Sequence, residues 1–498
     1  MEDIKLHAWQ EENVGFIEKH KFTLIADEMG LGKTFSALAA VKKNNLYPCL
    51  ILCPKSLKVN WQREIKRIDH YKSIEILDGT AKGTPPKQKN GRFASDYTIL
   101  HYNSLKLIPV LPECKSIILD EIHYLKGYKS KRTIVVQKYI REKSNAFYVV
   151  GLSGTPILNK GSEIFTVVNV LHANVDSKGK VPENQYDGDG GLLTWEEFHG
   201  ENDEKFTIKT YFRERFIGYE IKTEKLVELN KLLKDRGIMI RHTKDLLKDT
   251  LPPKTKNAFI LPKPKGYQKE LNRLEAKYGE LAVPQLTMIR KWLAEEKVMD
   301  VTEYVQNIID QSETDKVIVF GNYKEATMML GKKLGVAAIN SDTKFEERQP
   351  IIDKFQSDPN VRVLVMTVKT GNVGLNLVEA NHVVFNDYSY SPSDMMQAEA
   401  RIDRIGQTKP VTIHYMSSQN TVDEDVIDLL TKKQNVLNGI IDGTPYTYDE
   451  KGIEQSVLEK LNAMMKSQKI QKTKTAMFKQ VKNKSKLFSP SYDWSEKI

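Results

Sequence analysis

The stretch Asp27-Glu28-Met29-Gly30-Leu31-Gly32-Lys33-Thr34 decides how the N-terminal part of this chain folds. An apolar run at 22–26 precedes it and a helical pattern at 34–43 follows it, which predicts a loop between a strand and a helix. Such a glycine-rich loop points backbone N–H groups at the phosphates of a nucleotide, brings Lys33 to them and offers the Thr34 hydroxyl to Mg²⁺. Asp27 stands where this type of loop usually has glycine. The stretch predicts a nucleoside-triphosphate site.

Length and composition indicate a globular protein of several domains. At roughly 100 to 200 residues per domain, 498 residues predict two to four units, and 40% hydrophobic with 28% charged residues suits ordinary cores. No apolar run approaches the roughly 18 residues of a membrane span, and the first 20 residues are too charged for a secretory signal. We expect an intracellular protein with no membrane partner. The cysteines Cys49, Cys53 and Cys114 lack metal-ligand spacing and are expected to be buried thiols.

Positive charge is concentrated near the C-terminus. The formal net charge is +10, and the segment 466–486 alone contains eight lysines and no acidic residue. Such a segment is either a solvated end or an arm that holds DNA. The sequence leaves both interpretations open.

Short apolar runs alternate with helical patterns in two regions of the chain. This alternation predicts buried parallel strands joined by helices, and therefore two doubly wound α/β lobes. The strands expected in the first region are 22–26, 50–53, 98–101, 117–119 and 148–151. Those expected in the second are 317–320, 337–339, 363–366, 382–386 and 411–415.

Breaker residues and composition predict the domain limits. We expect a first lobe at 1–160, a helical insertion and interlobe connector at 161–311, a second lobe at 312–443, and a helical, lysine-rich extension at 444–498. Proline clusters at 251–254 and 261–264 mark the connector, because proline interrupts helices and strands.

Paired carboxylates, Asp120 and Glu121, follow the apolar run 117–119. Open α/β sheets bind their ligands beyond the carboxyl ends of the strands. Asp120 would hold Mg²⁺, usually through water, and Glu121 would orient or deprotonate the attacking water. An Asp-Glu pair that merely caps a strand is the structural alternative, but the phosphate loop upstream favours catalysis.

Further motifs follow in a fixed order: Leu6-His-Ala-Trp-Gln10, Cys53-Pro-Lys-Ser-Leu57, Leu152-Ser-Gly-Thr-Pro156, Gly371-Asn-Val-Gly-Leu-Asn-Leu377, and Gln397 to Gln407. Together with the phosphate loop and the paired carboxylates, this set resembles helicase superfamily 2. The phrases DEMGLGKT, LSGTPILN and ARIDRIGQ are similar to the Swi/Snf-type DNA translocases in particular. The resemblance covers roughly residues 4–415 and implies two RecA-like lobes that share one ATP.

The resemblance implies a nucleotide site built from both lobes. Gln10 would read the adenine, and further nucleotide contacts would come from Gly374 and Gln397. Arg401 and Arg404 would be arginine fingers. Two cations three residues apart on a helix face the same side, where they can neutralise the charge that builds on the γ-phosphate. Lys33 would act with them as a catalytic cation.

The same resemblance implies DNA contacts, made mainly to phosphates, that carry little sequence information. The candidates are Lys55, Ser56, Tyr102, Asn103, Lys369 and Thr370. Ser153 and Thr155 would sense the phosphate site and pass its state toward bound DNA. His123 is expected to be a structural or coupling residue, as is His242, which replaces a usual arginine of the connector.

These expectations describe a monomeric translocase, dependent on ATP and Mg²⁺, that moves on double-stranded or branched DNA and remodels forks or displaces bound proteins. The lobes would meet around ATP and part after hydrolysis, so that each cycle shifts one lobe's grip. Two alternatives stay open: a strand-separating helicase with the same ATPase, and a DNA-binding scaffold whose ATPase is vestigial. The complete set of catalytic residues argues against the scaffold.

Overall fold

The computed structural model of the chain describes residues 5–77, 87–108, 112–127, 130–142, 146, 148–156, 163–171, 230–371, 377–442 and 460–465. Gly374, most of the expected insertion and the lysine-rich segment 466–486 lie outside these residues. Within them, no helix is both long enough and apolar enough to cross a membrane.

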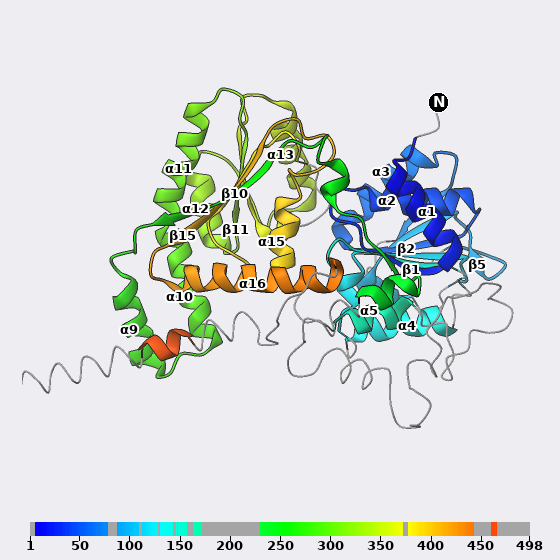
Figure 1. Cartoon of the computed structure of the whole chain (residues 1–498), viewed down its shortest axis with the longest axis horizontal. Helices are drawn as coiled ribbons and strands as arrows, with labels where there is room; N and C mark the ends of the chain where they lie inside the picture. The colour runs from blue at the N-terminus through cyan, green and yellow to red at the C-terminus, as the bar shows by residue number, and fades with distance from the viewer. Residues whose placement is uncertain are drawn as a thin grey trace, which may run out of the picture.

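The first lobe is built on seven parallel strands in the order β3-β6-β2-β7-β8-β1-β9 (Figure 1). They are β1 Phe22–Ile25, β2 Cys49–Cys53, β3 Ile74–Leu77, β6 Tyr97–His101, β7 Ser116–Asp120, β8 Tyr148–Leu152 and β9 Met239–Ile240. A short antiparallel pair, β4 Gln88–Lys89 and β5 Arg92–Phe93, lies between β3 and β6 in the chain. The apolar runs predict five of the seven strands.

Alternate residues of these strands point into two cores, one on each face of the sheet. On β1, for example, Leu24 belongs to one core and Ile25 to the other. Helices α4 Lys131–Glu142 and α5 Glu163–Leu171 contribute to the first core, and α1 Ala8–His20, α2 Lys33–Lys43 and α3 Lys58–Ile68 cover the second. The sheet is doubly wound, as predicted.

The second lobe has six parallel strands in the order β10-β15-β14-β11-β13-β12. They are β10 Lys254–Leu261, β11 Val317–Gly321, β12 Ala338–Ile339, β13 Val363–Thr367, β14 His382–Phe385 and β15 Val411–Ser418. Helices again lie on both faces. One core contains residues of α9 Tyr267–Tyr278, α10 Val283–Glu296, α13 Phe345–Ser357 and α15 Pro392–Glu399, and the other residues of α11 Val298–Gln311 and α12 Lys324–Lys333.

The expected connector range 161–311 contains one strand of each sheet. Strand β9 pairs with β1 in the first sheet, and β10 pairs with β15 along its whole length in the second. The chain therefore crosses from one sheet to the other between Ile240 and Lys254. The domain limits given above stay predictions.

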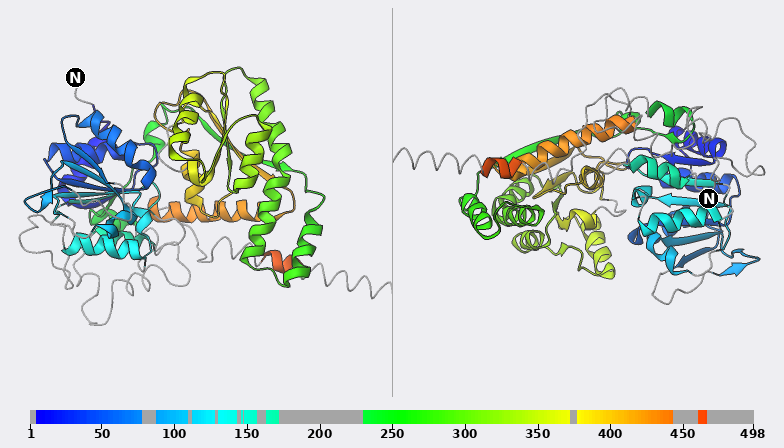
Figure 2. Two further views of the ribbon diagram at one scale, coloured as in Figure 1. Left: turned by 180° about the vertical axis from the view of Figure 1, so that it is seen from behind. Right: turned by 90° about the horizontal axis from the view of Figure 1, so that it is seen from below.

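A long helix, α16 Val422–Asp442, extends from the second lobe to the first (Figures 1 and 2). Near its start, Val426 is buried in the core of the second lobe. Near its end, Ile441 belongs to a core of the first lobe, and Asp442 lies 2.8 Å from Nε of Arg241. The two lobes are thus joined by this helix as well as by the connector.

Candidate active site

The phosphate loop begins where β1 ends, at the carboxyl edge of the first sheet. Gly30 and Gly32 have φ angles of +93° and +79°, a region that glycine occupies without steric penalty. Helix α2 begins at Lys33, so its first N–H groups and its positive dipole end face the loop. Strand, loop and helix follow one another as expected, and this geometry favours a bound anion.

Lys33 lies over the loop that precedes it. Its ammonium group donates to the carbonyl oxygens of Asp27 at 2.7 Å and Glu28 at 3.3 Å. Burial lowers the pKa of Lys33, while the charges of Asp27 and Glu121 oppose this shift. The cation is therefore held among carbonyl and carboxylate groups at the mouth of the loop.

Helix α1 presses two side chains against the same loop. Trp9 and Gln10 both donate to the carbonyl oxygen of Leu31, at 3.0 Å and 3.2 Å. A Cβ added at Gly32 would lie 2.3 Å from Nε2 of Gln10, so this glycine permits the close approach. Gln10 thus borders the phosphate loop, and its contact with adenine stays a prediction.

The paired carboxylates stand at the end of β7, two positions from β1 in the sheet. Trp61 on α3 donates from Nε1 to Oδ2 of Asp120 at 2.7 Å. Burial, and then the neighbouring charge of Glu121, raise the pKa of Asp120 to about 7. Glu121 has a φ of +50°, which turns the chain sharply after the strand.

The turn after β8 connects the carboxylates to the loop. Nδ1 of His123 lies 3.0 Å from Oγ of Ser153 and 3.2 Å from Oε2 of Glu121. A Cβ added at Gly154 would lie 2.6 Å from Cγ of Met29. The paired carboxylates, the turn after β8 and the phosphate loop, which are far apart in the sequence, therefore meet at one place. The predicted coupling residues His123 and Ser153 lie there. Thr155 is 2% exposed, and its N–H donates to Oγ of Ser153 at 3.2 Å.

The second lobe brings its arginine segment to the phosphate loop. A Cβ added at Gly30 would lie 2.9 Å from Cβ of Arg404 and 3.6 Å from the carbonyl oxygen of Asp403. Burial and the nearby Arg404 lower the pKa of Arg401 to about 10, with the charge of Glu121 opposing them. Arg404 in turn interacts electrostatically with Glu64 of α3. The segment that carries both predicted fingers therefore lies against the first lobe.

A cavity of about 400 Å³ lies between the lobes beside these groups. Glu121, His123 and Arg132 line it from the first lobe, and Lys369 and Gln397 line it from the second. The predicted contact residue Gln397 thus lies on the interlobe cavity.

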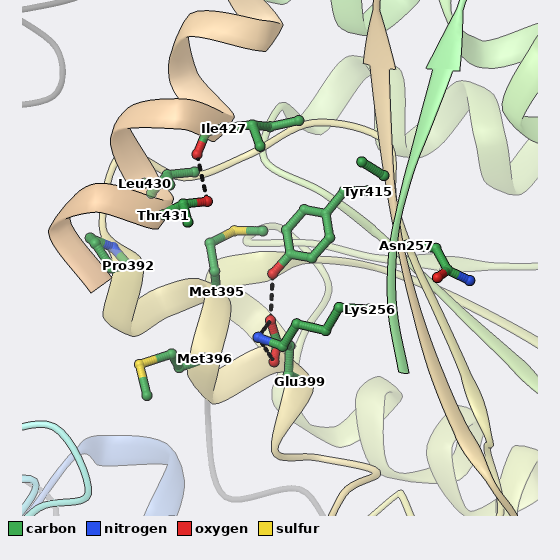
Figure 3. A pocket seen from close by; sticks show the side chains of 11 residues that line it. Lys256, Asn257, Pro392, Met395, Met396, Glu399, Tyr415, Ile427, Leu430 and Thr431 are labelled. Atoms are coloured by element: carbon green, nitrogen blue, oxygen red, sulfur yellow. Dashed lines mark hydrogen bonds and ion pairs between the residues drawn. The ribbon is translucent and has the colours of Figure 1, made fainter. Parts of the chain in front are cut away.

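A second cavity, of about 440 Å³, lies within the second lobe among β10, β15, α15 and α16 (Figure 3). Glu399, at the end of α15, accepts hydrogen bonds there from Lys256 at 2.8 Å and from the hydroxyl of Tyr415. Glu399 is 3% exposed. These contacts fix the end of α15 two residues before Arg401.

Three DNA candidates have side chains open to solvent. Lys55 and Asn103 are exposed, and Lys369 is exposed on the short helix α14 Val368–Gly371. Ser56, beside Lys55, is half-buried. DNA contacts by these four residues stay a prediction.

The other two DNA candidates are buried. Tyr102 is 1% exposed, and its hydroxyl donates to the carbonyl oxygen of Asp120 at 2.6 Å. Thr370 is 9% exposed, and its hydroxyl lies 2.7 Å from that of Thr367. Tyr102 therefore supports the catalytic strand in this structure and does not offer its hydroxyl to a DNA phosphate.

The residues present fit a Mg²⁺ ion. The Thr34 hydroxyl and the Asp120 carboxylate are hard oxygen donors, and Mg²⁺ typically takes one or two carboxylates and completes its shell with water and phosphate. Burial, and then the adjacent charge of Glu121, raise the pKa of Asp120, because two neighbouring carboxylates repel each other. A divalent cation would relieve this repulsion.

Sequence patterns do not identify several residues that build the site. They are Trp61, Arg241, Lys244 and Asp403, whose partners lie far away in the chain. Arg241, for example, donates from its guanidinium group to the carbonyl oxygen of Ala26 at 2.6 Å. Asp403 could have been found from the sequence, because it stands between the two predicted arginine fingers.

Comparison with known proteins gives matches along most of the chain. The family model described as SNF2-related domain matches residues 9–274, and that of the helicase conserved C-terminal domain matches residues 300–406. The human protein named DNA annealing helicase and endonuclease ZRANB3 is 26% identical over 476 residues, covering 88% of this chain and 40% of that protein.

A relative from Caenorhabditis elegans, the SWI/SNF-related matrix-associated actin-dependent regulator of chromatin subfamily A-like protein 1 homolog, is 28% identical over 453 residues. The match covers 88% of this chain and 62% of that protein, so the chain spans less than two thirds of either relative. Among solved structures, the Sulfolobus solfataricus SWI2/SNF2 ATPase core in complex with dsDNA is 22% identical, with a TM-score of 0.39. That match covers 89% of this chain and 94% of the other.

Proposed function

The chain belongs to the SNF2-related family, and from this premise we propose that it is an ATP-dependent translocase on double-stranded DNA. It couples hydrolysis to movement and acts on forks, branched DNA or DNA that carries bound protein. The names of two relatives, a DNA annealing helicase and a chromatin regulator, support DNA as the substrate.

The contact between the phosphate loop and the arginine segment carries this proposal. Gly30 of the first lobe lies against the backbone of Arg404 of the second, as the short distance for an added Cβ indicates. A triphosphate at the loop would therefore touch groups from both lobes. Loss of the γ-phosphate removes part of the contact between them, and hydrolysis is thereby coupled to lobe movement.

Each catalytic side chain has a distinct task. Lys33 binds the β- and γ-phosphates, and Glu121 orients the attacking water and accepts its proton. Arg401 and Arg404 stabilise the charge that develops on the transferred phosphoryl group. Mg²⁺ bound by Thr34 and Asp120 would neutralise charge on the phosphate oxygens.

ATP turnover with and without duplex DNA tests the proposal. We expect strong stimulation by DNA and displacement of a third strand from a linear triplex, which reports movement without strand separation. Lys33→Ala and Glu121→Gln should abolish turnover but retain DNA binding, because neither side chain is a DNA candidate. Equal turnover with and without DNA would contradict the motor interpretation.

Two further substrates separate the proposed activity from its alternatives. Separation of a simple forked duplex in the presence of ATP would identify a strand-separating helicase instead. Migration of a four-way junction would support action on branched DNA. DNA binding with no ATP turnover under any condition would indicate a scaffold.

A further inference from the structure

The segment that leaves the first sheet after β9 is bound closely to the phosphate loop. The N–H of His242 donates to Oδ1 of Asp27 at 3.0 Å, and the carbonyl oxygen of His242 accepts from the N–H of Glu28 at 2.8 Å. The N–H of Lys244 donates to Oε2 of Glu28 at 2.7 Å. The loop and this segment must therefore move together.

The side chain of Lys244 reaches across to the second lobe. Its Nζ lies 2.8 Å from Oδ2 of Asp403, and it also donates to the carbonyl oxygen of Asp403. The two side chains are 13% and 9% exposed, so water competes little for the pair. Asp403 stands between Arg401 and Arg404 in the chain. Lys244 thus contacts the backbone that carries both arginines.

Asp403 has a second cationic partner, which belongs to its own lobe. Nζ of Lys254, on β10, lies 3.0 Å from the same Oδ2 atom. Burial acts to raise the pKa of Asp403, but Lys244 and Lys254 outweigh burial and lower it. The carboxylate therefore stays charged, and it keeps one partner if the lobes separate. The contact with Lys244 can break without leaving the carboxylate of Asp403 unpaired.

An ion pair inside the second lobe shows the contrast. Lys297 and Asp423 lie 2.5 Å apart, are 1% and 2% exposed, and both belong to elements of that lobe. Movement between the lobes cannot break such a pair. The Lys244–Asp403 pair is different because its two members lie on opposite sides of the interface.

We propose that Lys244 and Asp403 form an interlobe latch that positions Arg401 and Arg404 against the phosphate loop. Lys244 is then a positioning residue, and its role rests on the ATP hydrolysis proposed above. With the latch closed, the arginine segment lies on Gly30. With the latch open, Lys254 retains Asp403 and both arginines withdraw with the second lobe.

Steady-state kinetics of Lys244→Met test the positioning role. We expect kcat to fall about 10- to 100-fold, because small displacements of catalytic groups are costly. KM for ATP and DNA affinity should change less than about threefold, since Lys244 does not bind the reacting atoms. Lys244→Arg, which keeps the charge, should restore most of the rate. The matched control Lys291→Met removes an exposed partner of Glu325 at 3.1 Å and should leave kcat unchanged.

Fluorescence transfer between the lobes tests the latch without requiring hydrolysis. The three native cysteines are buried, so Tyr71→Cys and Met299→Cys, at positions 90% and 58% exposed, can be labelled selectively. Lys244→Met should shift the transfer toward longer interlobe distances, whereas Lys291→Met should not.

Each combination of results decides the proposal. Lower kcat together with longer distances supports it. Lower kcat with unchanged distances overturns it, because the effect of Lys244 then stays within the first lobe. Longer distances with full kcat, or no change in either, overturn it as well. If the wild-type protein hydrolyses no ATP, the proposed function fails, and the distances alone then decide whether the latch exists.

Discussion

The substitution Gly30→Ala tests whether the contact between the lobes sets the rate of turnover. The added Cβ would lie 2.9 Å from Cβ of Arg404, whereas ordinary van der Waals contact begins at 3.4 Å. The arginine segment must therefore retreat by about 0.5 Å or more. A displacement of about 1 Å at a catalytic group can cost on the order of 100-fold in rate. The φ of +93° adds backbone strain of about 1–2 kcal/mol for a residue with a side chain.

Gly335→Ala separates the strain from the contact. Gly335 has a φ of +69°, and nothing lies within 4 Å of a Cβ added there. Both variants should lose about 1–2 kcal/mol in urea unfolding. Only Gly30→Ala should lose DNA-stimulated turnover, by about 10- to 100-fold, while it still binds a fluorescent ADP analogue. Equal turnover in the two variants, or loss of ADP binding in Gly30→Ala, would refute the reasoning.

Two further outcomes follow from the structure and one from the sequence. Trp61→Phe removes the N–H donor of Asp120 and should cost about 1.5–3 kcal/mol in urea unfolding above pH about 8, where Asp120 is charged, since this is the usual value for a hydrogen bond to a charged group. For His242, burial would lower the pKa, but hydrogen bonds to Asp27 and Glu12 raise it. Its stabilising effect is therefore complete below pH about 6.5 and is lost as pH rises through its higher folded-state pKa. The difference in melting temperature between wild type and His242→Asn should therefore shrink as the pH rises above about 6.5. Deletion of 466–498 should weaken DNA binding and flatten its salt dependence, because fewer counterions are released. If the dependence of DNA affinity on salt concentration is unchanged, residues 466–498 do not contact DNA phosphates.

The parts of the site that sequence predicts are those whose chemistry is local. The phosphate loop needs glycines, a lysine and a threonine within one stretch, and the paired carboxylates follow a recognisable apolar strand. The two arginines are visible within the motif 397–407, but the expected helix ends at Glu399 and both arginines lie in the turns that follow it, so the argument from helical spacing does not hold. The structure places all three groups on one interface, although their catalytic roles stay predictions.

Contacts between distant residues could not be predicted in this way. Trp61 and Asp120 are 59 residues apart, and Lys244 and Asp403 are 159 apart, so only the folded sheet order brings them together. Strand β10 escapes prediction because seven of its eight residues are exposed and its first four residues are polar or charged. The sequence also gives no sign that Tyr102 is buried.

Helix α16 limits how far apart the two lobes can travel, because each of its ends is packed into a different lobe. Its 21 residues make it about 30 Å long at the usual rise of about 1.5 Å per residue. Pivoting about the end near Ile441 by only about 6° would displace the opposite end by about 3.4 Å, the spacing of successive base pairs along a duplex. If the chain moves along DNA as proposed, a rigid lever of this length would convert a slight rocking motion into an advance of one base pair.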